Sequence, residues 1–267
     1  MKNKKWTPYW SVFRIRAQLE TQYRAAALGG LVTQVFFGIV LICLYTALFD
    51  GNDPQMLQET VTYVWLQQMF FRMMLNSDGE LIDMILTGNI AYAMIRPVDQ
   101  HSYWLMRDFA ARLVGALMRL TPMVLLQWIL PPALRMALPG SPVAFAQFTV
   151  SLLLGAVILS QIGGIIDAIV MRTLDTRGIS AMINLIKMIF SGNIIPLTLF
   201  PDSVQSLIRY QPFAQALDAP TRMYLQAQPA AEWLMNLSVQ LGWIVLIAAL
   251  GRWMWARRLD RMTVQGG

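Results

Sequence analysis

Few residues in this sequence could do acid–base, nucleophilic or metal chemistry, and they are scattered along the chain. One cysteine (Cys43) and one histidine (His101) leave no basis for a cysteine- or histidine-rich metal site or a Ser–His hydrolase. Asp78, Glu80 and Asp83 form the only carboxylate cluster, which we interpret as a solvated acidic rim rather than a cation site. No GxxxxGK[ST], HExxH, GxSxG or CxxC motif occurs. The sequence therefore predicts no catalytic site, metal or cofactor in this chain.

The composition is that of an integral membrane protein. Of the 267 residues, 56% are hydrophobic and only 13% are charged, whereas a soluble domain carries about 25% charged residues. The formal net charge is +6. In a membrane chain we assign this excess to loops at the cytosolic leaflet, not to nucleic acid.

The apolar residues predict an all-α, polytopic protein with six transmembrane helices. We place them at about residues 25–49, 60–75, 109–130, 143–171, 179–195 and 233–255. The second stretch is short and polar, with Gln67, Gln68 and Arg72. Arg119 and Lys187 fall near mid-span, so we expect them to face a cavity or a partner instead of lipid.

Residues 1–24 are predicted to form an amphipathic helix lying at the inner membrane surface. If the N-terminus is cytosolic, the outer loops hold only Arg135, Arg209 and Arg222 of the 21 Lys and Arg residues. Because basic residues prefer the cytosolic side, we expect both termini to be cytosolic.

Two connections between spans are expected to be structured. The inner one covers about residues 76–108, with a short helix before Gly88 and a break at Pro97. The outer one covers about residues 191–231 and holds five of the 13 prolines. Its apolar pieces are too short to span, so we expect short re-entrant helices shielded by the neighbouring spans.

Several motifs, in order along the chain, resemble those of ABC-2 type permeases, the membrane subunits of bacterial ATP-driven exporters. The stretch GNIAYAMIRPV from Gly88 to Val98 is similar to the cytosolic loop after the second span of that family. Further similarity lies between the fifth and sixth spans and at the C-terminal end, in Ser191–Leu197, Phe200-Pro201, Gln211-Pro212-Phe213, Ala219-Pro220 and Val264–Gly267.

The resemblance implies a six-span domain over residues 25–267 and a coupling element seated on a separate ATPase. The implied ATPase-coupling residues are Asp78, Glu80, Ile82, Ile85, Gly88, Arg96 and Pro97. The first, second and fifth spans would line the substrate path, which makes candidates of Gln34, Gln67, Phe70, Asn184 and Asn193. The outer re-entrant gate would include Gly192, Pro196, Pro201, Pro212, Phe213 and Pro220.

The leading hypothesis is therefore a non-enzymatic permease subunit of an ABC exporter in the bacterial cytoplasmic membrane. ATP and Mg²⁺ would be bound by the partner ATPase, and a second permease chain, identical or related, would complete the path within membrane lipid. Two alternatives remain open, an ATP-independent secondary carrier and a membrane-embedded lipid-modifying enzyme. A secondary carrier would need carboxylates at mid-depth of the spans, and the sequence has none there. A lipid-modifying enzyme would need a pair of polar groups at one membrane depth, and the sequence offers no clear pair.

Overall fold

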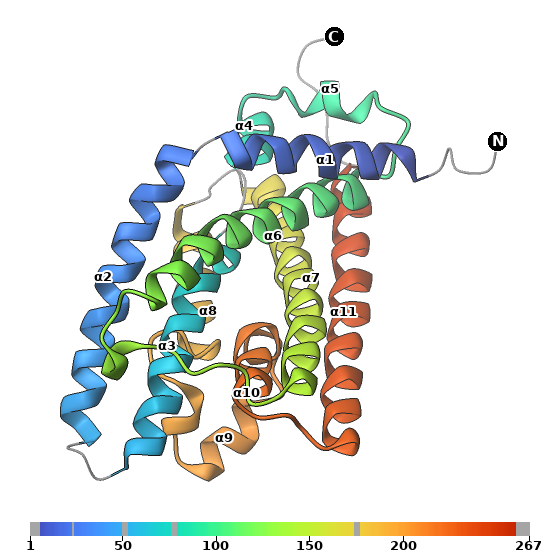
Figure 1. The fold of residues 1–267 in the computed structure, drawn as a ribbon. Helices are drawn as coiled ribbons and strands as arrows, with labels where there is room; N and C mark the ends of the chain where they lie inside the picture. The colour runs from blue at the N-terminus through green and yellow to red at the C-terminus, as the bar shows by residue number, and fades with distance from the viewer. Residues whose placement is uncertain (1–5, 23, 50–52, 76–78, 174–176, 260–267) are drawn as a thin grey trace.

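The computed structural model describes residues 6–22, 24–49, 53–75, 79–173 and 177–259, which form helices and connecting turns without a strand (Figure 1). Within these residues, four helices are long and apolar enough to cross a bilayer. They are α2 (Arg24–Phe49), α6 (Gln100–Gln127), α7 (Pro142–Thr173) and α11 (Ala230–Leu259). The chain is thus a multi-pass membrane protein, as predicted.

Helix α3 (Pro54–Met74) is surrounded by protein, in contact with α2, α6, α8 and α10. It begins after Asp53, whose carboxylate accepts a hydrogen bond from the Met56 N–H at 2.9 Å. Every side chain from Thr60 to Phe70 is buried. Because protein covers all its faces, α3 can carry polar side chains that lipid would not tolerate; the Trp65 indole, for example, donates to the Leu134 carbonyl at 2.7 Å.

Helix α8 (Arg177–Phe190) is shorter than the predicted fifth span, which was expected to reach Ile195. Its 14 residues extend about 21 Å at 1.5 Å per residue, against about 30 Å for the hydrocarbon core. The chain leaves the helix at Gly192, whose positive φ of 80° suits glycine. Length and composition thus support four of the six expected spans, and α3 and α8 do not meet these criteria.

At one end of the bundle, α1 (Thr7–Gln22) packs along α6 and crosses near the ends of α7 and α11, beside α4 (Gly79–Leu86) and α5 (Ile90–Met94) (Figure 1). Val12 is buried and Phe13 packs on Phe109, but Trp6 and Trp10 stay exposed. Helix α6 begins at Gln100, earlier than the expected 109, because Asp99 caps it by accepting from the Ser102 N–H. The connection from α3 therefore ends at Asp99 instead of 108.

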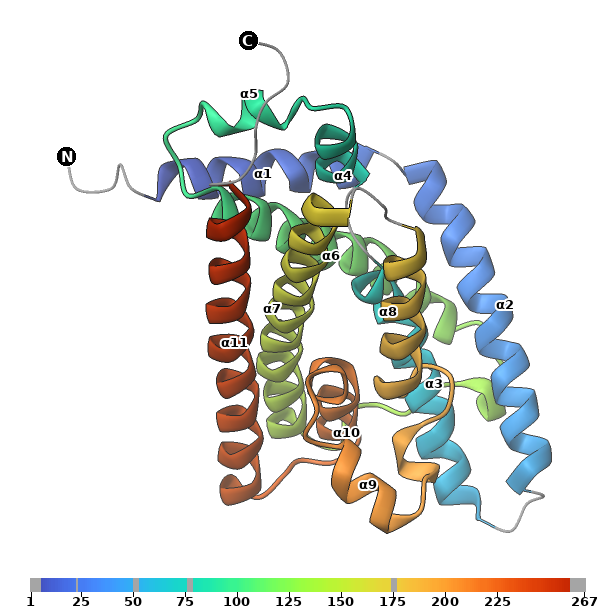
Figure 2. The same ribbon diagram turned by 180° about the vertical axis from the view of Figure 1, so that it is seen from behind.

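The opposite end carries the expected short helices ahead of α11 (Figure 2). A 3₁₀ turn (Leu197–Leu199) and α9 (Asp202–Ile208) lead to a π-helical turn (Ala214–Asp218) that continues into α10 (Ala219–Leu225). The π turn and α10 pack against α7 and are buried.

Candidate functional site

A small hydrophobic core holds α4 and α5 onto the ends of the long helices. Leu81 and Ile85 of α4 are buried together with Ile90 and Ala93 of α5. The partners in this cluster are Trp104 of α6, Ala168 and Met171 of α7, and Trp255 of α11. Helices α4 and α5 are therefore in direct apolar contact with three long helices, α6, α7 and α11.

Hydrogen bonds fix the corner between α5 and α6. The Gln100 amide donates to the Ala93 carbonyl at 2.8 Å, and the Arg96 guanidinium donates to the Tyr103 hydroxyl at 2.7 Å. Gly88, with a φ of +76°, ends α4 and lets the chain turn into α5. The corner is thus a folded element, as the sequence predicted, and not an extended loop.

The exposed residues of this element include large apolar side chains among polar ones. Leu86, Tyr92 and Ile95, which we call the α4–α5 surface, are exposed, Tyr92 by 72% and Ile95 by 77%. Beside them, a hollow of about 750 Å³ is lined by Trp6, Pro8 and Tyr9 of the N-terminal segment and by Arg96, Pro97, Val98 and Asp99. Large apolar side chains exposed on one short folded element are typical of a protein-binding surface.

Electrostatics at the hollow are mixed. Burial would raise the pKa of Asp99, but hydrogen bonds from Ser102 and the nearby charges of His101 and Arg252 hold it below its ordinary value. Asp99 is thus negative at neutral pH, and the Arg96 guanidinium group belongs to the same hollow. The surface offers both signs of charge around an apolar centre.

The predicted coupling residues divide between anchoring and exposed roles. Ile82 and Ile85 pack inward, and Glu80 forms an ion pair with Arg107 of α6. Arg96 and Pro97 line the hollow. Asp78 lies outside the described residues. The exposed Tyr92 and Ile95 were not predicted as contact residues, because only the fold shows which side of this segment faces away from the bundle.

A group of charges links α1 to the C-terminal end of α3. Glu20 of α1 pairs with Arg16 at 2.7 Å and with Arg72 of α3 at 3.4 Å. Gly115 of α6 leaves room for the Arg72 side chain, which would touch any Cβ added there. Arg72 is therefore accommodated by a partner on the surface helix and does not face lipid.

Two other cations cap the C-terminal end of α3. Arg112 donates to the Met73 carbonyl and to the Leu75 carbonyl, the latter at 2.9 Å, and also pairs with Asp108 at 2.5 Å. Lys187 of α8 donates to the Met74 carbonyl at 2.5 Å. These bonds satisfy carbonyls that a helix end leaves free. Lys187 faces protein, as expected from its position in the sequence.

The predicted path residues lie inside the single chain or at its half-buried faces. Phe70 is buried against Phe148, and Gln67 is buried with weak contacts of 3.5 Å from its amide nitrogen to Ser191 and Thr221. Within the described part of the chain, four of the five candidates keep an amide atom without a hydrogen-bond partner, namely Gln34, Gln67, Asn184 and Asn193. Such groups are rare in packed interiors and favour contact with water, a substrate or another chain.

The segment that carries the predicted gate residues also holds a buried polar network that was not predicted from the sequence. Asp218, 1% exposed, accepts from the Tyr63 hydroxyl and from the Arg222 guanidinium, both at 2.8 Å. Gly192 packs against Tyr63. Pro196 and Pro220 are buried, Pro212 and Phe213 are partly buried, and Pro201 is exposed just before α9. The spacing of Asp218 and Arg222, four residues apart in an apolar segment, was the available signal.

Comparison with known proteins identifies the family of this chain. The family model described as ABC-2 family transporter protein matches residues 30–266. No curated protein matches the chain. The matched region begins within α2 and includes α3 to α11 and every site residue predicted from the sequence.

Proposed function

Because the chain belongs to the ABC-2 family of transporter proteins, we propose that it is the permease subunit of an ATP-driven exporter. The observation that carries this proposal is the α4–α5 surface, an exposed apolar patch anchored on three long helices of a chain that has no nucleotide-binding motif. Energy would enter there from a separate ATPase subunit that binds ATP and Mg²⁺. Motion of α4 and α5 would be passed to α6, α7 and α11 through their shared core.

We further propose that α3 and α8 complete six membrane segments and that a second permease chain, identical or related, covers α8. A helix of about 21 Å followed by a bent segment leaves irregular backbone at membrane depth. Such backbone is tolerated only against protein or a water-filled cavity. Ile194 and Ile195 in this segment are exposed, as are Met182, Leu185 and Ile189 of α8. The path would then run along α2, α3 and α8, where the unpartnered amides lie.

The outer segment would act as the gate for release. Asp218 ties the π turn to Tyr63 of α3, so movement of α3 relative to α7 would pull on α10. Breaking this contact opens the segment without unfolding the long helices. The re-entrant placement of α9 and α10 in the outer leaflet is part of the same proposal.

The function is tested by measuring ATP hydrolysis with the full chain alone and in a complex with its ATPase subunit. We expect none from the chain alone and a changed hydrolysis rate on assembly, since the permease has only a docking surface. A complex with a hydrolysis-deficient ATPase subunit is the control. Hydrolysis by the chain alone, or substrate movement that persists with the deficient subunit, would favour an enzyme or a secondary carrier instead.

The orientation, with both termini cytosolic in a bacterial cytoplasmic membrane, is tested by cysteine labelling. In a Cys43→Ser background, Asn89→Cys and Ser203→Cys place thiols at opposite ends of the bundle. A membrane-impermeant maleimide added to intact cells is expected to label position 203 at once and position 89 only after permeabilisation. The reverse pattern contradicts the orientation while leaving the family assignment intact.

A further inference from the structure

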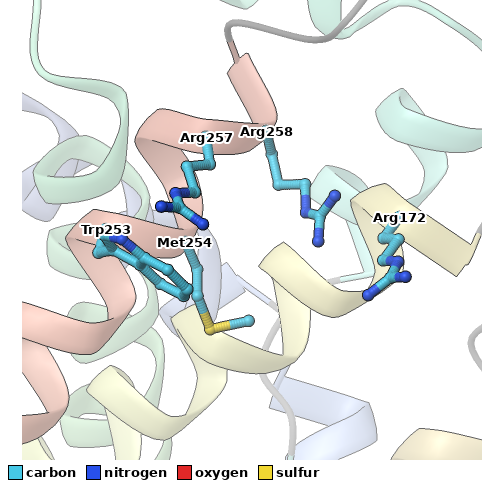
Figure 3. Close-up of a pocket in the computed structure, with 5 residues that line it drawn as sticks. All are labelled: Arg172, Trp253, Met254, Arg257 and Arg258. Atoms are coloured by element: carbon cyan, nitrogen blue, oxygen red, sulfur yellow. The ribbon is translucent and has the colours of Figure 1, made fainter.

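A basic hollow lies between the C-terminal ends of α7 and α11 (Figure 3). Arg172 of α7 and Arg257 and Arg258 of α11 line it together with Trp253 and Met254, and its volume is about 430 Å³. This size falls within the range of small-ligand sites, about 300–1,000 Å³. None of these residues belongs to the α4–α5 surface or to the proposed path.

The hollow has positive charge and no counter-charge of its own in the described structure. Within the described residues, no carboxylate lines it or pairs with these three arginines. Arginine stays protonated in proteins, so three guanidinium groups lining one hollow give it a positive potential that attracts anions. Arg257 is already placed over the Trp253 ring, 4.2 Å from its centroid, and Arg258 and Arg172 extend into the space between the helices (Figure 3).

An apolar strip on α11 leads up to the hollow. Leu246, Leu250 and Trp253 are exposed, Trp253 by 52%, and Arg257 follows one turn later on the same face. Tryptophan with arginine beyond it is the pattern of a helix crossing from acyl chains into headgroups. A soluble phosphate has no apolar group that could contact this strip, whereas the acyl chains of a lipid can pack along it.

We propose that this hollow binds the phosphate of an anionic phospholipid, with the acyl chains along Leu246, Leu250 and Trp253. The guanidinium groups suit phosphate because each can donate two parallel hydrogen bonds. The membrane orientation proposed above decides only which leaflet supplies the lipid. The site itself requires only that this end of the bundle lies at headgroup depth.

The probe is phosphatidylglycerol, titrated against the detergent-purified full chain by native mass spectrometry, with phosphatidylcholine as the neutral comparison. We expect preferential binding of phosphatidylglycerol. Each arginine near an anionic headgroup contributes about fivefold in affinity, so Arg172→Gln/Arg257→Gln/Arg258→Gln should weaken binding about 100-fold. All three side chains are at the surface, and an unchanged unfolding temperature checks that the variant folds. Arg258→Lys keeps the positive charge, so this variant should lose only a small part of the affinity for phosphatidylglycerol.

Arg252→Gln is the matched control, because Arg252 lies on the same helix and does not line the hollow. Equal loss in Arg252→Gln, or no preference for phosphatidylglycerol in the unaltered chain, would overturn the proposal. Displacement of the lipid by an equal concentration of glycerol phosphate would instead mark a soluble-anion site. Pocket variants that keep lipid binding but release the ATPase subunit would mark a protein contact, and this too contradicts the lipid assignment.

Two carboxylates near these helix ends in the sequence, Asp175 and Asp260, lie outside the described residues. Asp175→Asn/Asp260→Asn therefore completes the set of variants. Unchanged affinity for phosphatidylglycerol supports an open site. An increase of more than about tenfold, the effect of removing two charged competitors, would show that the chain fills the hollow with its own carboxylates and would refute the proposal.

Discussion

Replacing both Tyr92 and Ile95 with aspartate is expected to weaken binding of the ATPase subunit by about 100-fold or more and to remove coupled ATP hydrolysis. The few hot-spot side chains at the centre of an interface contribute about 2 kcal/mol or more each, and a buried carboxylate adds a desolvation cost. Both residues are mostly exposed in the single chain, 72% and 77%. The substitution should therefore leave the stability of the chain itself unchanged within about 0.5 kcal/mol.

The measurement is the dissociation constant of the purified permease for its ATPase subunit in detergent, together with the hydrolysis rate of the complex. Leu138→Asp is the control, since Leu138 is 87% exposed in the connection between α6 and α7 and belongs to neither α4 nor α5. Undiminished binding by the double variant would exclude the α4–α5 surface as the docking site. A deletion of residues 78–97 that retains stimulated hydrolysis would exclude it independently.

A single added methyl group at Gly155 is expected to destabilise the protein more than any surface change. A Cβ at this position of α7 would lie 2.8 Å from the carbonyl carbon and 2.9 Å from the Cα of Ala216, within the π turn. These are backbone atoms, and Gln240 holds this turn through its hydrogen bond of 2.7 Å to the Gln215 carbonyl. The helix and the turn must therefore separate.

We expect Gly155→Ala to cost about 3 kcal/mol, at the upper end of overpacking effects, and to lower the unfolding temperature in detergent. Gly242→Ala is the control, because nothing lies within 4 Å of a Cβ at that position of α11. Alanine is a better helix former than glycine, so this control should stabilise the chain by up to about 1 kcal/mol. Unfolding of both variants at the same temperature as the unaltered chain would contradict the close approach of α7 to the π turn.

The sequence predicted the apolar helices more reliably than the polar one. Helix α7 has nearly the predicted bounds, 142–173 against 143–171, because hydropathy measures preference for an apolar environment directly. Helix α3 was the least distinct prediction, with Gln67, Gln68 and Arg72 lowering its hydropathy. Its environment is protein, where Arg72 finds in Glu20 a partner that lipid lacks.

For the candidate site, the sequence predicted the segment of the chain but not which of its side chains are exposed. The motif from Gly88 to Val98 located the corner between α5 and α6, and Gly88 and Pro97 marked its turns correctly. Which side chains are exposed depends on the cluster of Leu81, Ile85 and Trp255 that fixes the orientation of α4 and α5. Trp255 is far away in sequence, so no local pattern could reveal that Tyr92 and Ile95 face outward.

The sequence alone determined that this chain crosses a membrane several times, that it contains no GxxxxGK[ST] motif, and that its motifs resemble those of a transporter family. These properties depend on composition and local order. Only the tertiary structure decided that Asp218 meets Tyr63, that Lys187 caps α3, and that three arginines surround one hollow. Each of these contacts joins residues on different helices, and the packing of helices depends on side-chain shape over the whole bundle, which local hydropathy does not record.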